Sequence, residues 1–271
     1  MSLADHIPHT EPGIELLFLG TGTSHGVPMI GCDCGVCTST NPRNNRTRSS
    51  ALLRLQSPEA HVLIDTSIDF RIQALRHRIR RIDAILFTHH HADHIFGLDD
   101  VRTFSDRQGR IDCYVPSFCA ERMKAVFGYA FASPDIDDSG GLPRLNLRLV
   151  DGPIDVLGHR VVPVRLPHGR HTSVFGYRVG RLAYLTDCSA IPDEALPLLD
   201  GLDVLVLDAL RHAPHPTHFS IDQAVAAARL IRAERTFFTH ICHRAEHDAL
   251  AASLPPEIQP AWDGLCVRVR G

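Results

Sequence analysis

Residues 88–94 read Thr-His-His-His-Ala-Asp-His, and they follow directly on the mostly apolar run 83–87. The run predicts a buried strand, so a cluster of ionisable side chains stands where that strand ends. Such groups are costly to bury unless something pairs them, and imidazole and carboxylate groups bind divalent ions such as Zn²⁺, Mn²⁺ or Fe²⁺. The segment therefore predicts a metal site rather than a surface histidine cluster. Its candidate ligands, enough to serve two ions, are His89, His91, Asp93 and His94.

Strands and helices alternate around this segment. In the first part of the chain, apolar runs predict strands at 14–19, 50–55, 61–64 and 82–88. Ser67 is expected to cap a helix between the last two of these strands. The apolar residues expected on one face of that helix are Ile68, Ile72, Leu75 and Ile79.

The alternation returns late in the chain, where strands are expected at 203–207 and 236–239 and a capping box, Ser220 to Gln223, opens a helix between them. Short strands of a meander are expected at 142–150, 159–166, 173–179 and 181–186. Residues 130–141 are expected to form a surface loop or lid. No linker or repeat separates the two parts. The sequence therefore predicts an α/β fold in one domain, residues 1–271, with two sheets between helices in a four-layer αβ/βα sandwich.

Charge and hydropathy argue against two classes of protein, general nucleic-acid-binding proteins and membrane-spanning proteins. The net charge is -3 at pH 7, which argues against a protein whose whole surface binds nucleic acid. No stretch approaches the roughly 18 uncharged apolar residues that would span a bilayer. Residues 1–10 lack the apolar segment of a secretory signal. We therefore expect a cytoplasmic protein with no membrane partner.

Three cysteines, Cys32, Cys34 and Cys37, lie within six positions. This spacing is too tight for a disulfide framework but is typical of a metal-binding knuckle in a reducing compartment. Three thiolates and one imidazole would complete a closed, tetrahedral Zn²⁺ site.

The pattern His89-X-His91-X-Asp93-His94 after a strand matches the HxHxDH motif of the metallo-β-lactamase superfamily, and the chain resembles that superfamily from about residue 15 to residue 270. The resemblance implies three further ligands, each after a predicted strand: His168, Asp187 and His240. It places His89, His91 and His168 around one ion. It places Asp93, His94 and His240 around a second ion, with Asp187 as the bridge. Asp65, which ends an earlier strand, matches the acid that orients the ligands in this superfamily.

The loop 19–28, Leu-Gly-Thr-Gly-Thr-Ser-His-Gly-Val-Pro, and the cysteine knuckle together resemble the PhnP-like branch, the cyclic phosphodiesterases of phosphonate degradation. In that branch a histidine three residues beyond the last active-site histidine completes the structural zinc site, which implies His243; Cys242 is a competing ligand. The branch also implies that His218 contacts the substrate phosphate and protonates the leaving oxygen. A histidine near a helix N-terminus suits contact with an anion.

The resemblance thus implies a dinuclear metal-dependent hydrolase, a phosphodiesterase that acts on small cyclic phosphate or nucleotide-like phosphodiesters with a metal-activated water. The expected cofactors are two divalent ions, zinc or manganese, in the active site and one structural zinc. Asp93 is expected to bind metal and to orient the water, and His218 to act as the catalytic acid. We expect a small-molecule partner and no nucleic acid; a homodimer is compatible with the sequence, which leaves the oligomeric state open.

Two other classes share some of these motifs. The tRNA 3′-processing endonucleases have the Gly-Thr-Gly loop and the HxHxDH motif, but they usually clamp tRNA with a basic flexible arm, and the sequence has no comparable arm. Accessory proteins resembling PqqB also carry a cysteine-rich knuckle. Their active-site motif is degraded, whereas all seven ligands are present here.

Overall fold

The computed structural model describes residues 13–132 and 141–270. The strands are β1 (Gly13–Gly20), β2 (Ser50–Leu55), β3 (Ala60–Ile64), β4 (Ala84–Leu86), β5 (Ile111–Pro116), β6 (Leu145–Val150), β7 (Ile154–Val156), β8 (His159–Pro167), β9 (Ser173–Val179), β10 (Leu182–Leu185), β11 (Val204–Asp208), β12 (Arg235–Thr239), β13 (Ile258–Pro260) and β14 (Cys266–Arg270). The α-helices are α1 (Phe70–Arg76), α2 (Ala92–Ile95), α3 (Arg102–Gln108), α4 (Ala120–Phe127), α5 (Ile221–Ile231) and α6 (His247–Ser253). Short 3-10 helices are η1 (Pro42–Asn44), η2 (Leu98–Val101), η3 (Ser117–Cys119), η4 (Gly128–Phe131) and η5 (Asp193–Leu199).

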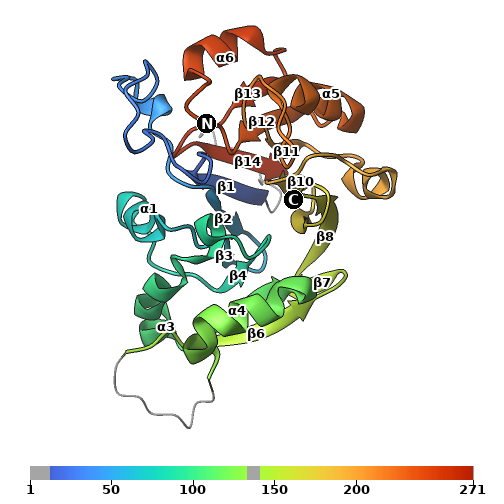
Figure 1. Ribbon diagram of the computed structural model, residues 1–271. Coiled ribbons are helices and arrows are strands. Elements are labelled where there is room, and N and C mark those ends of the chain that lie inside the picture. Colours follow the sequence, from blue (N-terminus) through green and yellow to red (C-terminus); the bar gives the residue numbers. More distant parts are fainter. Residues whose placement is uncertain (1–12, 133–140, 271) are drawn as a thin grey trace, which may run out of the picture.

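The strands form two seven-stranded sheets, in the orders β14-β1-β2-β3-β4-β5-β6 and β13-β12-β11-β10-β9-β8-β7. The first half of the chain builds the first sheet and the second half builds the other, except that β14 returns to pair antiparallel with β1 (Figure 1). β3 and β4 are parallel, and so are β10, β11 and β12, so the carboxyl ends of these strands gather at the edges of the two sheets.

A buried apolar layer joins the two sheets. The rings of Phe18 in β1 and Phe237 in β12 have centroids 6.0 Å apart within it. A second cluster packs Phe70, Phe104 and Met123 of α1, α3 and α4 against the outer face of the first sheet. A third cluster packs α5 and α6 against the outer face of the second sheet. The predicted α/β class and four-layer αβ/βα sandwich are therefore confirmed.

Several local predictions agree with the structure. The strands predicted at 50–55 and 173–179 have those bounds. The capping box is formed, because the Gln223 N–H donates to Ser220 Oγ at 3.3 Å and the Ser220 N–H donates to Gln223 Oε1 at 2.9 Å. The helices α2, α3, α4 and α6 and the strands β5, β7, β13 and β14 were not predicted from the sequence.

The predicted apolar face of the first helix was wrong. α1 begins at Phe70, Ser67 does not cap it, and Ile68, Ile72 and Leu75 are exposed by 45%, 52% and 63%. Ile79, the fourth residue of the predicted face, is buried, but it lies beyond the end of α1 at Arg76. Phe70 and Gln73 are the buried residues of this helix. Gln73 is buried because its side-chain amide donates to Thr47 Oγ1 and to the Arg48 carbonyl, both at 2.9 Å.

Parts of two predictions lie outside the described residues: the loop or lid at 130–141, of which 133–140 are not described, and the statement about residues 1–10. A single domain over 1–271 stays a prediction. In the described part of the chain, no helix combines the length and the apolar character that crossing a membrane requires.

Candidate metal centre

The predicted ligands lie at one edge of the sandwich, where strands of both sheets end. His89 and His91 follow β4, and Asp93 and His94 lie in the short helix α2 that comes next. The other three ligands, His168, Asp187 and His240, come just after β8, β10 and β12. Buried strands therefore bring together residues from positions 89 to 240.

The ligand atoms form two adjacent groups. One holds His89, His91 and His168, the other holds Asp93, His94, Asp187 and His240, and within each group the ligand atoms lie within 4.8 Å of one another. Asp187 approaches His94 Nε2 at 3.2 Å and His240 Nε2 at 3.3 Å, and it also groups with His168. The structure thus brings together all seven residues that the sequence predicts as ligands, with Asp187 between the two groups.

Three residues of this centre have a left-handed backbone. Asp65, Asp187 and His240 have φ values of 58°, 57° and 59°. For residues other than glycine this conformation is uncommon, costs of order 1–3 kcal/mol and is often found at functional sites. Each of the three residues directly or closely follows a strand, so the bend turns its side chain at the sheet edge.

Neighbouring groups fix the ligand rings. His94 Nδ1 donates to Asp65 Oδ2 at 2.7 Å, and the buried Asp65 also accepts the N–H and the hydroxyl of Thr88, both at 2.8 Å. His168 Nδ1 donates to the Thr217 carbonyl at 3.0 Å. In the neutral ring, each bond leaves Nε2 as the nitrogen with a free lone pair, which is the arrangement that a metal ligand needs.

The electrostatics of the cluster favour a cation. Burial lowers the pKa of His94, but the carboxylates of Asp187, Asp93 and Asp65 outweigh it and raise that pKa well above its ordinary value. Burial raises the pKa of Asp187, but His240 and His94 outweigh it and hold that pKa well below its ordinary value. Burial lowers the pKa of His168 to about 4, which keeps this ring neutral and able to bind a metal.

The donor set fits divalent ions. Within the described residues, Nε2 of His89, His94 and His240 are buried atoms without a hydrogen-bond partner. An unsatisfied buried polar atom costs about 1–3 kcal/mol. Coordination of ions by these nitrogens and by the carboxylates of Asp93 and Asp187 would remove that cost, and mixed nitrogen and oxygen ligands suit zinc or manganese.

His218 stands beside the ligands, in the loop between β11 and α5. Its ring stacks on that of His240 with centroids 4.6 Å apart, and lies 4.9 Å from the ring of His168. His218 Nδ1 donates to Asp208 Oδ2 at 2.8 Å. Burial lowers the pKa of His218, but the Asp208 carboxylate outweighs it and raises that pKa to about 9. A cationic N–H donor therefore stands at the centre.

Asp208 is a site residue that the sequence analysis missed. It is fully buried, accepts the N–H of Cys188 at 3.1 Å, and lies 3.9 Å from His240 Nδ1. Its position at the end of an apolar run could have identified Asp208 from the sequence. Asp208 ends the apolar strand β11 as Asp65 follows β3, and a carboxylate in that position is unusual unless the site uses it.

The cysteine knuckle forms a third group with His243, again with ligand atoms within 4.8 Å of one another. His243 Nδ1 lies 3.3 Å from Cys32 Sγ and 3.4 Å from Cys34 Sγ. Cys242 lies outside the group, and its sulfur accepts the N–H of Arg244 at 3.4 Å. Hydrogen bonds from the Cys37 N–H and from His243 lower the pKa of Cys34 to about 6, which favours the thiolate that zinc binds.

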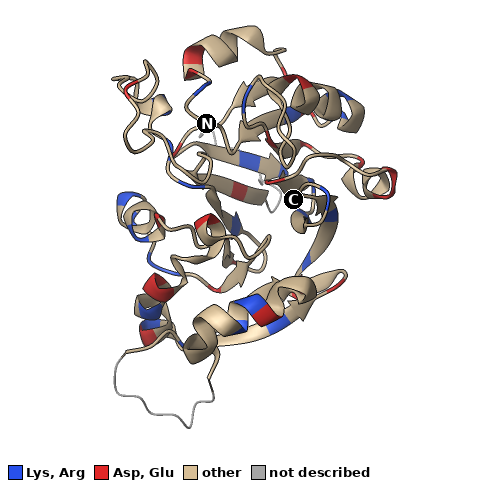
Figure 2. Cartoon of the chain, viewed as in Figure 1, with Lys and Arg blue, Asp and Glu red and all other residues tan. Residues whose placement is uncertain are grey.

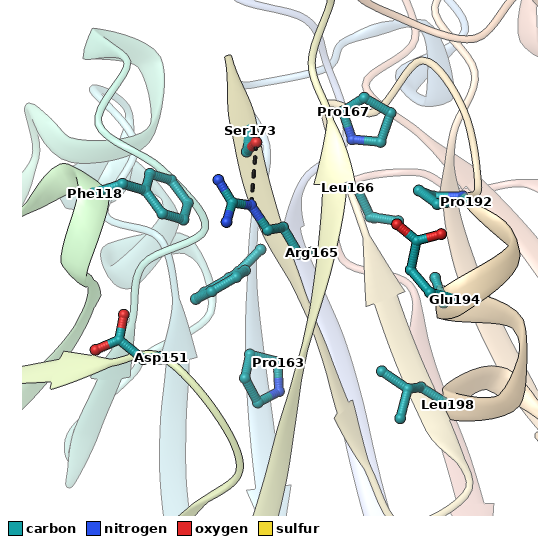
Figure 3. Close-up of a pocket in the computed structure, with 12 residues that line it drawn as sticks. Phe118, Asp151, Pro163, Arg165, Leu166, Pro167, Ser173, Pro192, Glu194 and Leu198 are labelled. Carbon is teal, nitrogen blue, oxygen red and sulfur yellow. Dashed lines mark hydrogen bonds between the residues drawn. The ribbon is translucent and has the colours of Figure 1, made fainter. Parts of the chain in front are cut away.

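A groove of about 470 Å³ is lined by residues of β8 and of the segments packed on it (Figure 3). One end carries Pro167 and Ser173, which flank the loop that holds His168. In the groove, the Arg165 guanidinium lies 5.4 Å from the centre of the Phe118 ring, and Arg165 Nε donates to Ser173 Oγ at 3.3 Å. Figure 2 shows acidic and basic residues mixed along α3 and α4 rather than gathered in one basic face.

Comparison with known proteins gives three informative likenesses. A protein of Porphyromonas gingivalis named octanoyltransferase is 36% identical over 256 residues, which are 93% of this chain and 51% of that protein. The chain therefore spans about half the length of that relative. Ribonuclease Z of Listeria innocua is 34% identical over 116 residues, 41% of this chain and 33% of that protein. The crystal structure of a new diphosphatase from the PhnP family is 44% identical with a TM-score of 0.87, and the match covers 94% of this chain and 97% of that one.

Residues 60–241 match the family model described as the beta-lactamase superfamily domain. The match contains His89 to His94, His168, Asp187 and His240. The chain therefore belongs to the metallo-β-lactamase superfamily of hydrolases and is a PhnP-like member of it.

Proposed function

We propose that this protein is a metal-dependent phosphodiesterase that acts on small cyclic phosphate or nucleotide-like phosphodiesters. The observation that carries the proposal is the position of His218, an Asp208-bound imidazole whose ring stacks on the ligand His240. A protonated imidazole beside a metal centre suits a reaction in which an anionic substrate binds and an alkoxide leaves.

The ligands would hold two divalent ions, one at His89, His91 and His168 and one at Asp93, His94 and His240, with Asp187 between them. When bound, the ions supply Lewis acidity, which acidifies water and withdraws charge from phosphoryl oxygens. A third ion, zinc, would be held by Cys32, Cys34, Cys37 and His243, as a staple that keeps the N-terminal loop beside the end of β12.

Side chains of the protein would bind the substrate, donate the proton and orient the water. His218 would contact a phosphoryl oxygen and then donate its Nε2 proton to the leaving oxygen. Asp208 would hold that ring by Nδ1 and stabilise its charged form. Asp93 would bind metal and accept a hydrogen bond from the attacking water, which orients the water. The groove with Phe118 and Arg165 would give room for the part of a substrate beyond the scissile phosphate.

A nuclease that processes tRNA is the second candidate, and the match of 116 residues to ribonuclease Z favours it. The net charge of -3 argues against the extended basic surface that RNA of this size needs, and acidic and basic residues are mixed along α3 and α4 (Figure 2). We favour a PqqB-like accessory role less, because such a role would leave the complete ligand set and His218 without a function.

A substrate panel tests the proposal. Protein stripped by a chelator and reconstituted with zinc or manganese should hydrolyse bis(p-nitrophenyl) phosphate, 2′,3′-cyclic nucleotides or cyclic ribose phosphates, and His218→Ala should lower kcat at unchanged metal content. Preferred hydrolysis of lactones or thioesters, or full activity of His218→Ala, would contradict it. Cleavage of precursor tRNA in place of the small phosphodiesters would select the nuclease.

A further inference from the structure

The loop 215–218 carries a second histidine at the centre. His215 lies three residues before His218, and the centroids of the two rings are 5.2 Å apart. The His215 side chain is half-buried. From the sequence alone, His215 is a residue that could line the pocket but for which a role outside the chemistry is favoured.

The loop is fixed against the metal ligands. The Thr217 carbonyl accepts the Nδ1 proton of His168 at 3.0 Å. Gly169 lies so close to Thr217 that a Cβ atom at position 169 would meet Thr217 Cγ2 at 2.8 Å, and the φ of +81° at Gly169 also favours glycine. The position of Thr217, to which His215 is hydrogen-bonded, is therefore set by contacts with His168 and Gly169.

Hydrogen bonds fix the tautomer of His215. The Thr217 N–H donates to His215 Nδ1 at 3.3 Å, and Thr217 Oγ1 lies 3.1 Å from the same nitrogen. A backbone N–H can only donate, so Nδ1 must be the unprotonated nitrogen. The neutral ring therefore carries its proton on Nε2, on the side away from this backbone. Burial, together with His218 and Arg211, lowers the pKa of His215, in agreement with a neutral ring.

The hydrogen bonds at Nδ1 therefore differ between the two histidine rings of this loop. Asp208 holds His218 by Nδ1 as an acceptor, whereas Thr217 holds His215 by Nδ1 as a donor. The Thr217 contact leaves Nε2–H as the donor that the neutral His215 ring can offer to a ligand, whereas His218 offers Nε2–H when its ring is protonated. Two neighbouring imidazole rings whose centroids are 5.2 Å apart are suited to two oxygens of one phosphoryl group or to one oxygen shared between them.

We propose that His215 is a substrate-contacting residue that donates Nε2–H to a non-bridging oxygen of the phosphate held at His218. The inference rests on the proposed phosphodiesterase function and deepens it, because it assigns phosphate recognition to a second side chain of the same loop. His215 binds the substrate and the product phosphate; the proton for the leaving oxygen comes from His218.

Two variants separate this role from a structural one. In His215→Asn the amide oxygen stands where Nδ1 was and can accept the Thr217 N–H, but no donor replaces Nε2. In His215→Gln the amide nitrogen reaches the position of Nε2 and keeps a donor. His212→Ala, an exposed residue of the same segment, is the matched control.

The metal-loaded protein and its variants are assayed with bis(p-nitrophenyl) phosphate, with inorganic phosphate as inhibitor, and phosphate-induced shifts in Tm are measured without turnover. We expect His215→Asn to raise KM and the inhibition constant of phosphate about tenfold, in keeping with one lost hydrogen bond to an anion, with a smaller change in kcat and unchanged metal content. His215→Gln should recover most of the loss, and His212→Ala should match the wild type.

The proposal fails if His215→Asn and the wild type bind phosphate equally well while the wild type hydrolyses the phosphodiester. It also fails if His215→Asn loses metal or if Asn and Gln variants are equally impaired, because either result makes His215 a support for the loop. A wild type that binds phosphate but hydrolyses no phosphodiester would instead overturn the proposed function.

Discussion

His218 Nδ1 lies 2.8 Å from Asp208 Oδ2, and the carboxylate has no exposed surface. A buried carboxylate that accepts the Nδ1 proton of a histidine fixes the ring, its tautomer and its charge. Because the same His218 ring stacks on the candidate ligand His240, Asp208 connects the candidate acid to the candidate metal centre without being one of the predicted ligands.

Asp208→Asn should therefore reduce catalysis more than metal binding. The amide presents at most one acceptor and removes the charge that keeps His218 protonated, so we expect kcat to fall about 10- to 100-fold, the usual size of such outer-sphere effects. Turnover of bis(p-nitrophenyl) phosphate and elemental analysis of the same sample measure both properties. The exposed Asp222→Asn of α5 is the control, and an Asp208→Asn protein with wild-type kcat would exclude the role.

Asp65→Asn should weaken metal retention. Asp65 accepts three hydrogen bonds, from His94 Nδ1 and from the N–H and the hydroxyl of Thr88, and an amide cannot accept all of them in the same geometry. We expect metal affinity to fall about 10- to 100-fold in competition with a chelator. Asp106→Asn on the exposed side of α3 should behave as the wild type. Equal affinity of Asp65→Asn and wild type would mean that His94 needs no such orientation.

Arg46→Met should loosen the cysteine site from a distance. Arg46 is fully buried and donates to the carbonyls of Cys242 and Ala245, on both sides of His243. A buried carbonyl left without a partner costs about 1–3 kcal/mol. We expect a lower Tm and faster loss of zinc to a chelator, whereas Arg244→Met, an exposed neighbour of His243, should change neither. Unchanged zinc retention in Arg46→Met would show that Arg46 does not stabilise the cysteine site.

The groove along β8 predicts a dependence on substrate size. Arg165→Ala removes a guanidinium that lies over Phe118, so substrates with a group beyond the scissile phosphate should lose affinity. We expect KM for 2′,3′-cyclic nucleotides to rise about 3- to 10-fold, the effect of one weak polar or cation–π contact, with less change for cyclic ribose phosphates. Arg160→Ala, on the same strand but outside the groove, is the control. Equal changes in KM for both substrate classes would show that the groove does not contact the group beyond the scissile phosphate.

The convergence of the candidate metal ligands could be predicted from the sequence because its signals are local. Each ligand closely follows an apolar strand, and a polar side chain in that position is costly unless it has a partner. Asp208 carries the same signal at the end of an apolar strand, but it was matched to no motif in the sequence, so its hydrogen bond to His218, ten residues further on, became visible only in the structure.

The face of α1 could not be predicted for a different reason. The spacing of Ile68, Ile72 and Leu75 suits a buried helical face, but the structure exposes them and buries Gln73. The partners of Gln73, Thr47 and the Arg48 carbonyl, come from a distant segment, and such contacts override a local pattern.

Metal content tests the central claim most directly. Protein purified under metal-replete conditions should contain about three divalent ions per chain, two at the strand ends and one at the cysteine knuckle. Asp187→Ala should lose the ions of the strand-end centre and keep the one at the knuckle, and Cys34→Ser should do the reverse. A wild-type protein that hydrolyses phosphodiesters with ions only at the knuckle, or that keeps the full count after Asp187→Ala, would contradict the account.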